Sequence, residues 1–253
     1  MSDFEYKKIE NGISIIKYTG EETVINIPDK IDGLPVISIG SKAFAENHHI
    51  TSITIPDSVA NIGESAFWEC DSLTNIHLPE KLSCISESML CACRSLEHIT
   101  IPDGVTSIES FGFYCCDKLA DITIPDSVTT IGKSAFTYAF ALESITIPDS
   151  VTSMGEAAFA CCTALKNITL SRKLTSIERN TFTGCHNLTE ITIPESVTSI
   201  KKNALDCLHM KKIIFIGRKN LDEIELDDEW KGISNPKIVF KPKKTGFFGL
   251  PES

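Results

Sequence analysis

Cysteine is the residue in this 253-residue chain with the widest range of possible chemistry, because a thiol can ligate zinc, form a disulfide or act as a nucleophile. Five of the ten cysteines recur at 23 residues or a multiple of 23: Cys70, Cys93, Cys116, Cys162 and Cys185. Asn47 and Ala139 occupy the same place in two other intervals. Because free cysteine behaves as a small buried hydrophobe, we interpret this cysteine ladder as reduced structural thiols.

A zinc site and disulfides are the alternatives for these thiols. The best zinc candidate is Cys91-x-Cys93 with His98 nearby, but a structural zinc requires four converging ligands. Ladder thiols about 5 Å apart approach the Cα separation of a disulfide, yet their parallel side chains make a bridge awkward. We therefore expect no metal and no cofactor. The remaining cysteines lie outside the ladder: Cys84, Cys91, Cys115, Cys161 and Cys207.

Catalysis needs a nucleophile and a positioned base, and no pair of residues here shows such a spacing. Of the six histidines, His77 and His98 fall at outward positions of consecutive repeats, while the others fall in turns. We interpret them as solvated or interface residues. The sequence therefore favours a chain that is not an enzyme.

Acidic residues form a further row, one after each repeated proline: Asp57, Glu80, Asp103, Asp126, Asp149 and Glu195. Arg172 interrupts the row. Aspartate after proline is typical of turns, which is our first interpretation. Attraction of cations or of a basic partner is the second.

The net charge of −10 argues against nucleic acid and anionic lipid as partners, because a phosphate backbone demands a concentrated basic surface. No stretch approaches the roughly 20 apolar residues of a membrane span, so we expect no membrane insertion. The N-terminus mixes charges and contains no apolar run of a signal peptide, so as written the chain is expected to be cytoplasmic. We also expect a monomer.

All these positions belong to one internal period of 23 residues. Taking the residue after each Ile or Leu as the origin, the series is Pro56, Pro79, Pro102, Pro125, Pro148, Ser171, Pro194 and Gly217, with no insertion or deletion expected. Apolar rows repeat in the same register, such as Phe113, Phe136 and Phe159. A 23-residue unit cannot bury its apolar face alone, and stacking of successive units buries it.

Each coil should carry two short parallel strands and one tight turn. Alternation in Leu-x-x-Ile-x-Ile-Pro predicts the first strand, and Val-Thr-Ser-Ile-Gly predicts the second. Between them, Ala-Phe-x-x-Cys is expected to form a single helical or 3₁₀ turn. The fold class is therefore a repeat solenoid in which Phe113, Phe136 and Phe159 lie directly over one another.

The ends of such a stack require caps, because a bare terminal coil exposes apolar surface and strand edges. Asn11-Gly12 is a strong hairpin signal, so residues 1–27 are predicted to form an N-terminal hairpin cap. Residues 28–217 should form about eight coils. Residues 218–253, with Trp230, are interpreted as a C-terminal cap and tail.

The pattern Leu-x-x-Ile-x-Ile-Pro-Asp-Ser-Val-Thr-Ser-Ile-Gly-x-x-Ala-Phe-x-x-Cys, almost intact from Leu119 to Cys162, resembles the BspA-type leucine-rich repeat. The resemblance covers about residues 15–217. It implies a curved solenoid, common in bacterial surface or secreted proteins that bind host or matrix proteins, with no catalytic residues to carry over. By this resemblance the compartment would be extracellular or the cell surface.

We therefore expect a non-catalytic protein-binding scaffold, with adhesion or host and matrix interaction as its role, whose contact residues are variable and point outward. The alternatives are a purely structural or intracellular interaction protein, with ice or cation binding as remote options. The hypothetical binding residues beside a row of outward threonines are Thr74, Asn75, His77, Glu97, His98, Asp121, Glu143, Ser144, Lys166, Asn167 and Glu190. Aromatics near the turn form a second candidate patch: Trp68, Tyr114, Tyr138 and Phe140.

Overall fold

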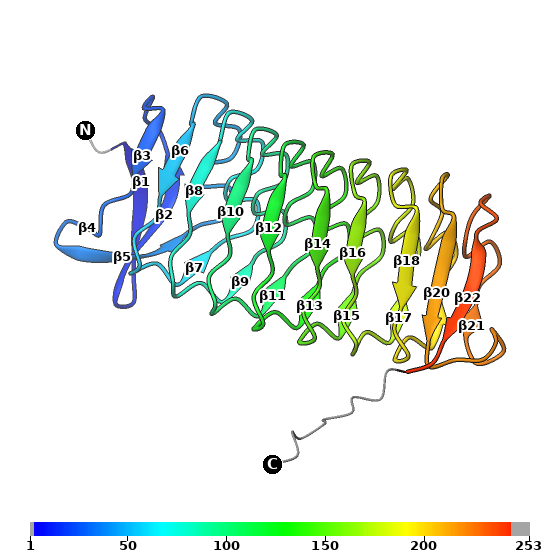
Figure 1. The fold of residues 1–253 in the computed structure, drawn as a ribbon. Helices are drawn as coiled ribbons and strands as arrows, with labels where there is room; N and C mark the ends of the chain where they lie inside the picture. The colour runs from blue at the N-terminus through cyan, green and yellow to red at the C-terminus, as the bar shows by residue number, and fades with distance from the viewer. Residues whose placement is uncertain (1–2, 244–253) are drawn as a thin grey trace, which may run out of the picture.

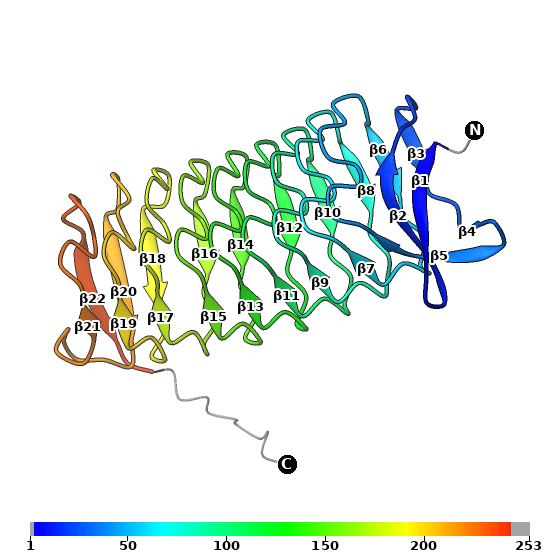
Figure 2. The ribbon, with the colours of Figure 1, turned by 180° about the vertical axis from the view of Figure 1, so that it is seen from behind.

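A computed structural model describes residues 3–243 of the chain as one β-solenoid. The coils lie side by side in an elongated body, with an N-terminal hairpin at one end and β22 at the other (Figures 1 and 2). Each regular coil places one short strand on each of two faces, here named face A and face B. The predicted solenoid with short parallel strands is confirmed.

Face A consists of ten strands that run in the same direction. Parallel ladders join β3, β6 and β8, then β10 and β12, then β14 and β16, then β18, β20 and β22. The strands are β3 (Val24–Asn26), β6 (Ser52–Thr54), β8 (Asn75–His77), β10 (His98–Thr100), β12 (Asp121–Thr123), β14 (Ser144–Thr146), β16 (Asn167–Thr169), β18 (Glu190–Ile193), β20 (Lys212–Ile216) and β22 (Lys237–Lys241).

Apart from β5, face B is built from shorter strands than face A, and each of its strands precedes the turn that returns the chain to face A. Its strands are β5 (Leu34–Ile39), β7 (Asn61–Ile62), β9 (Cys84–Ile85), β11 (Ser107–Ile108), β13 (Thr130–Ile131), β15 (Ser153–Met154), β17 (Ser176–Ile177), β19 (Ser199–Ile200) and β21 (Glu225–Leu226). Pairing keeps the repeat in register, as Ile108 aligns with Ile131.

The core between the faces is a set of stacked identical side chains, as the period predicts. The ring of Phe136 lies 5.3 Å from that of Phe113 and 5.1 Å from that of Phe159, measured between centroids. All three rings are fully buried and nearly parallel to their neighbours. Buried phenylalanine stacked on phenylalanine therefore fixes the register of the coils, since a slip would part the rings.

The turn after face B corrects one expectation, because no residue between 3 and 243 is helical. Left-handed backbone occurs instead at the residue before the Ala and at the residue before the Cys position of Ala-Phe-x-x-Cys, such as Ser134 (φ 51°) and Tyr138 (φ 65°). Backbone amides of this segment donate to the next coil, as Phe136 does to the carbonyl of Ala158 at 2.8 Å. This third row of bonds between coils offsets the cost of left-handed residues, about 1 kcal/mol each.

The N-terminal hairpin is confirmed. Strands β1 (Phe4–Ile9) and β2 (Gly12–Tyr18) pair antiparallel around Asn11, whose φ is 67°. Strand β2 also pairs in parallel with β5, so the hairpin covers the first edge of face B. Tyr18 stacks on Phe44 with 5.4 Å between centroids, which closes the phenylalanine stack at this end. A further short strand, β4 (Lys30–Ile31), pairs antiparallel with β5.

One coil is a residue shorter than the repeat, contrary to the expectation of no deletion. Glu190 pairs with Lys212 across 22 residues, whereas the other regular pairs span 23. Consequently Ile213, not Ile214, aligns with the buried Ile191, and Ile214 takes the place of an outward threonine. The shortening lies just before Cys207, because the Gly184 amide still bonds the carbonyl of Asp206.

At the C-terminal end, β21 pairs with β19 and β22 pairs with β20, so residues after 217 extend both faces. Phe215 contacts Trp230 and Phe240, with centroid distances of 6.4 and 5.8 Å. The buried guanidinium of Arg218 donates to the carbonyls of Glu223 and Glu195. The division into a cap, a solenoid and a second cap at residues 27 and 217 remains a prediction.

Candidate functional site

The hypothetical binding residues beside the threonine row all lie in or next to strands β8 to β18 of face A, and all are exposed. They alternate along each strand with buried residues such as Ile76 and Ile122. Because the buried partners set the register, the outward side chains have fixed positions on a rigid sheet. Face A therefore displays variable chemistry on an invariant backbone, while binding itself remains a prediction.

Face A contains shallow hollows where a ligand could lie. A hollow of about 460 Å³ spans β12, β14 and β16, with Asp121, Asp126 and Thr146 among its lining residues. A second of about 320 Å³ lies over β8 and β10 and includes His77, Glu80 and His98. Both are open, so they suit an extended chain better than an enclosed small molecule.

Charges on face A include two ion pairs that bridge adjacent coils. Lys166 Nζ lies 2.9 Å from Glu143 Oε1, and the Arg172 guanidinium contacts the Asp149 carboxylate. The arginine lowers the pKa of the Asp149 carboxyl, chiefly through the side-chain hydrogen bond. Both pairs are largely exposed, so each contributes little to stability.

The acidic row lies at the turn that ends face A, consistent with our first interpretation. The Val59 amide donates to the carbonyl of Pro56 at 3.0 Å, closing the turn around Asp57. Asp57 Oδ1 also accepts the backbone amide of Glu80 at 3.2 Å. A carboxylate in this row thus accepts a hydrogen bond from the backbone of the next coil and is also exposed to solvent.

The turn edge, the stretch between the strand of face B and the following strand of face A, brings four aromatic rings together. Tyr114 contacts Phe111 and Tyr138 at centroid distances of 5.6 and 5.5 Å, and Tyr138 contacts Phe140 at 5.7 Å. Phe140 is 43% exposed, which is high for a ring of this size. Trp68, also at this edge, is half-buried. Tyr114, Tyr138 and Phe140 thus form a chain of ring contacts with Phe111, while binding at this edge remains a prediction.

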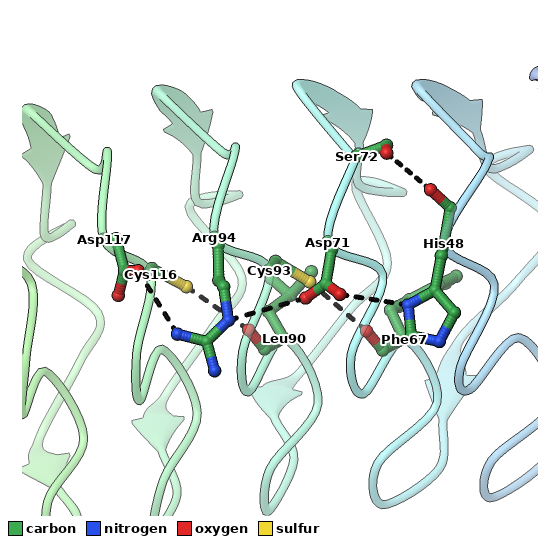
Figure 3. A network of polar contacts seen from close by, with 9 residues as sticks. All are labelled: His48, Phe67, Asp71, Ser72, Leu90, Cys93, Arg94, Cys116 and Asp117. Carbon is green, nitrogen blue, oxygen red and sulfur yellow. Dashed lines mark hydrogen bonds and ion pairs between the residues drawn. The ribbon is translucent and has the colours of Figure 1, made fainter.

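A polar network on the same edge was missed from the sequence. Arg94 reaches two carboxylates on the neighbouring coils, Asp71 at 3.6 Å and Asp117 at 3.3 Å, and His48 Nδ1 lies 3.0 Å from Asp71 (Figure 3). The 23-residue spacing of Asp71, Arg94 and Asp117, with alternating charge, is the signal that could have revealed it. The network joins four coils through side chains that are largely exposed.

The cysteine ladder is buried, and each thiol donates to a backbone carbonyl of the preceding coil. Cys93 Sγ donates to the Phe67 oxygen at 3.2 Å, as Figure 3 shows. Burial raises the pKa of Cys70 to about 12 and the pKa of Cys93 and Cys116 well above the usual thiol value. These thiols remain protonated near neutral pH and are therefore poor nucleophiles.

Cys207, which the sequence register placed outside the ladder, belongs to it. Its Sγ donates to the Phe182 oxygen at 3.2 Å, because the shortened coil moves it into the ladder position. At the other end, Asn47 Nδ2 donates to the Phe44 carbonyl at 2.7 Å. All ten cysteines are free thiols.

The zinc candidate does not assemble. Cys93 points into the core, Cys91 is half-buried at the turn edge, and His98 is exposed on face A. Within residues 3–243 no three His, Cys, Asp or Glu side chains are grouped to hold a metal ion. Over the same residues, no helix has the length and apolar character to cross a membrane.

Stacked 23-residue coils with conserved inward Leu and Ile positions define a leucine-rich-repeat solenoid. Residues 17–141 and 129–227 match the BspA type leucine rich repeat region, in six copies. The chain belongs to the BspA-type leucine-rich-repeat family. Among curated proteins no match is found.

Solved structures agree with this assignment. A leucine-rich repeat protein from Bacteroides ovatus is 27% identical over 97% of this chain and 72% of its own, with a TM-score of 0.77. A leucine-rich repeat protein of T. pallidum is 29% identical over 85% of this chain and 84% of its own, with a TM-score of 0.55. The pneumococcal vaccine antigen PcpA, 18% identical with a TM-score of 0.50 over 88% of this chain and 69% of its own, shares the fold.

Proposed function

We propose that the chain is a non-catalytic scaffold that binds a protein partner through face A. The observation that carries this proposal is the arrangement of exposed, variable side chains on a sheet whose inward positions are uniform. A backbone hydrogen-bonded between coils changes shape little on binding, which lowers the entropic cost of association. The open hollows of face A give it an uneven surface, into which side chains of a protein partner can fit.

The finer form of this proposal is adhesion to a host or matrix protein at the cell surface, as the family resemblance implies. A structural or intracellular interaction role is the alternative. Detection of the native protein on intact cells, by antibody labelling without permeabilisation, separates them. Labelling of intact cells supports adhesion, and labelling only after permeabilisation contradicts it.

The test uses the full chain as bait with extracts of its native organism, for an intracellular partner, and with extracts of host cells and matrix, for an adhesion partner. A face A variant combines Asn75→Ala, His77→Ala and Asn167→Ala, all exposed. A turn-edge variant combines Trp68→Ala, Tyr114→Ala and Tyr138→Ala. Circular dichroism and thermal unfolding verify that both retain the fold.

A partner retained by the wild type and the turn-edge variant, and lost from the face A variant, supports the proposal. A partner lost only from the turn-edge variant assigns binding to the aromatic surface and removes it from face A. The aromatic surface is the second candidate because four rings in contact, one of them Phe140, resemble the aromatic anchors of protein interfaces.

A further inference from the structure

Charge is segregated along face A. We consider the outward strand positions, the residue before each strand and the residue after each repeated proline. From β6 to β12 these places contain six carboxylates and no lysine or arginine: Asp57, Glu80, Glu97, Asp103, Asp121 and Asp126. From β16 onwards the same places contain Lys166, Arg172, Lys211, Lys212 and Lys237.

The two halves also differ in ion pairing. Acidic residues of the second half have basic partners, such as Glu190 with Lys212 at 2.7 Å and Glu195 with Lys243 at 2.6 Å. At the boundary, Glu143 and Asp149 are paired with Lys166 and Arg172. Within the described part of the chain, none of the six carboxylates in the first half forms an ion pair.

The hollow of about 320 Å³ lies over β8 and β10 within this acidic half, and the hollow of about 460 Å³ begins at β12 and continues over β14 and β16. Glu80 and Asp126 line them from the proline side, and Asp121 lines the larger one from the start of its strand. Thr100, Thr123 and Thr146 form the floor between these positions. A ligand here would rest on hydroxyl groups, with Asp121 and Asp126 at the two margins of the larger hollow and Glu80 at one margin of the smaller, which favours a cationic chain.

We propose that the acidic half of face A binds an extended polypeptide segment rich in lysine or arginine. This inference rests on the proposed function and names its partner class. Asp57 to Asp126 spans three coil steps, about 14 Å at the spacing of parallel strands, which is the length of four or five extended residues. Lysine or arginine at alternate positions of such a segment faces the carboxylates, and its other side chains face solvent.

The probe is a synthetic peptide of alternating lysine and serine, eight residues long and capped at both ends, with a glutamate and serine peptide as the reverse control. Binding to the full chain is measured by isothermal titration calorimetry at low and at moderate salt. We expect the lysine peptide to bind, the glutamate peptide not to bind, and salt to weaken binding because the carboxylates are exposed.

Two matched variants separate a local site from net charge. The face A triple variant is Glu80→Gln, Glu97→Gln and Asp126→Asn. The control triple is Glu64→Gln, Glu87→Gln and Asp222→Asn, all exposed, outside face A and without ion pairs in the described chain. Each raises the net charge by three. We expect the face A triple to weaken binding by about tenfold and the control by less than about threefold, since three exposed ion pairs are removed in one case only.

Equal weakening by both triples, or tighter binding of the glutamate peptide, overturns the proposal. Sedimentation velocity adds a further outcome, because the basic half of a second copy could occupy the acidic half. If the wild type and the control triple are dimers and the face A triple is a monomer, the occupant of the acidic half is a second copy of this chain, and the proposed basic peptide is wrong. In a last outcome, the native partner is lost from the variant with Asn75→Ala, His77→Ala and Asn167→Ala but retained by the face A triple. That result supports a binding scaffold and contradicts the inference that its partner is a basic segment.

Discussion

The thiol of Cys116 donates a hydrogen bond to the backbone carbonyl of Leu90, one coil earlier, across 3.3 Å. The carbonyl also accepts the backbone amide of Cys93, so both of its lone pairs are used in the core. In the next coil Ala139 takes the place of the cysteine, and the Phe113 carbonyl accepts the amide of Cys116 without a thiol donor. The ladder thus contains one missing bond.

Ala139→Cys should restore that bond. The new thiol would lie one coil from Cys116 and one from Cys162, the same separation that other ladder thiols tolerate. We expect a gain of about 0.5–1 kcal/mol in the free energy of unfolding, the net value of one buried hydrogen bond. The measurement is urea unfolding under reducing conditions. Destabilisation would show that the alanine site has no room for sulfur.

Alkaline pH should destabilise the fold through the same thiols. Burial raises the pKa of Cys70 from 9.0 to about 12, so the folded state keeps a proton that the unfolded state loses. The contribution of this thiol to the free energy of unfolding is fully present below about pH 9. It falls by about 1.4 kcal/mol per pH unit as the pH rises from about 9 towards 12. Urea unfolding between pH 8 and pH 10 measures the slope.

Cys70→Ser is the control for this dependence, because serine does not titrate in the range. The variant should be less stable at pH 8 but lose less free energy between pH 9 and pH 10. An unchanged slope would mean that other groups cause the alkaline loss.

Substitutions in the phenylalanine stack should destabilise the fold most at the middle of the stack. Phe136 is fully buried between Phe113 and Phe159, so Phe136→Ala removes two ring contacts and leaves a cavity. We expect a loss of about 3–5 kcal/mol. Phe136→Leu should cost less than half of that, because leucine fills this place at Leu90 and Leu205. Thermal unfolding ranks the two variants, and equal losses would contradict the stacking argument.

The network of Arg94 should contribute little although the arginine lies between two carboxylates, because its distances to Asp71 and Asp117, 3.6 and 3.3 Å, are long for charged hydrogen bonds. The Arg94 side chain is 53% exposed and those of Asp71 and Asp117 are 40% and 29% exposed, so water screens the two contacts in part. Arg94→Gln should therefore change the free energy of unfolding by less than about 1 kcal/mol. A loss of more than twice that, insensitive to added salt, would show that Asp71 and Asp117 depend on the arginine for burial.

The period predicted the stack because side chains at one repeat position become direct neighbours, as Phe113 and Phe136 do. It failed at Cys207 and Ile214 for a specific reason. A residue is missing before β20, so Ile193 pairs with Phe215 and the position of Pro194 corresponds to Ile216, not Gly217. The chain is longer again between β20 and β21, because Ser199 pairs with Glu225 across 26 residues.

The turn could not be predicted from local sequence. Left-handed backbone occurs at residues such as Ser65 and Tyr138, and the residue types that favour it appear at these turn positions only in the last coils, at Asn180, Gly184 and Asn203. The conformation is imposed by amides that donate to the next coil, such as that of Tyr138 to Ala160. The binding residues were placed on face A because strand alternation decides which side chains point outward, but alternation does not identify what they bind.

The third row of hydrogen bonds at the turn edge joins each coil only to its immediate neighbours, and the strands do the same. Molecular length is consequently an adjustable dimension, set by how many units the gene carries. Duplicating one unit would lengthen the body by one strand spacing, about 4.8 Å, and present the same side chains again. The length of such a protein can therefore change in steps of one coil while the packing of its core stays the same.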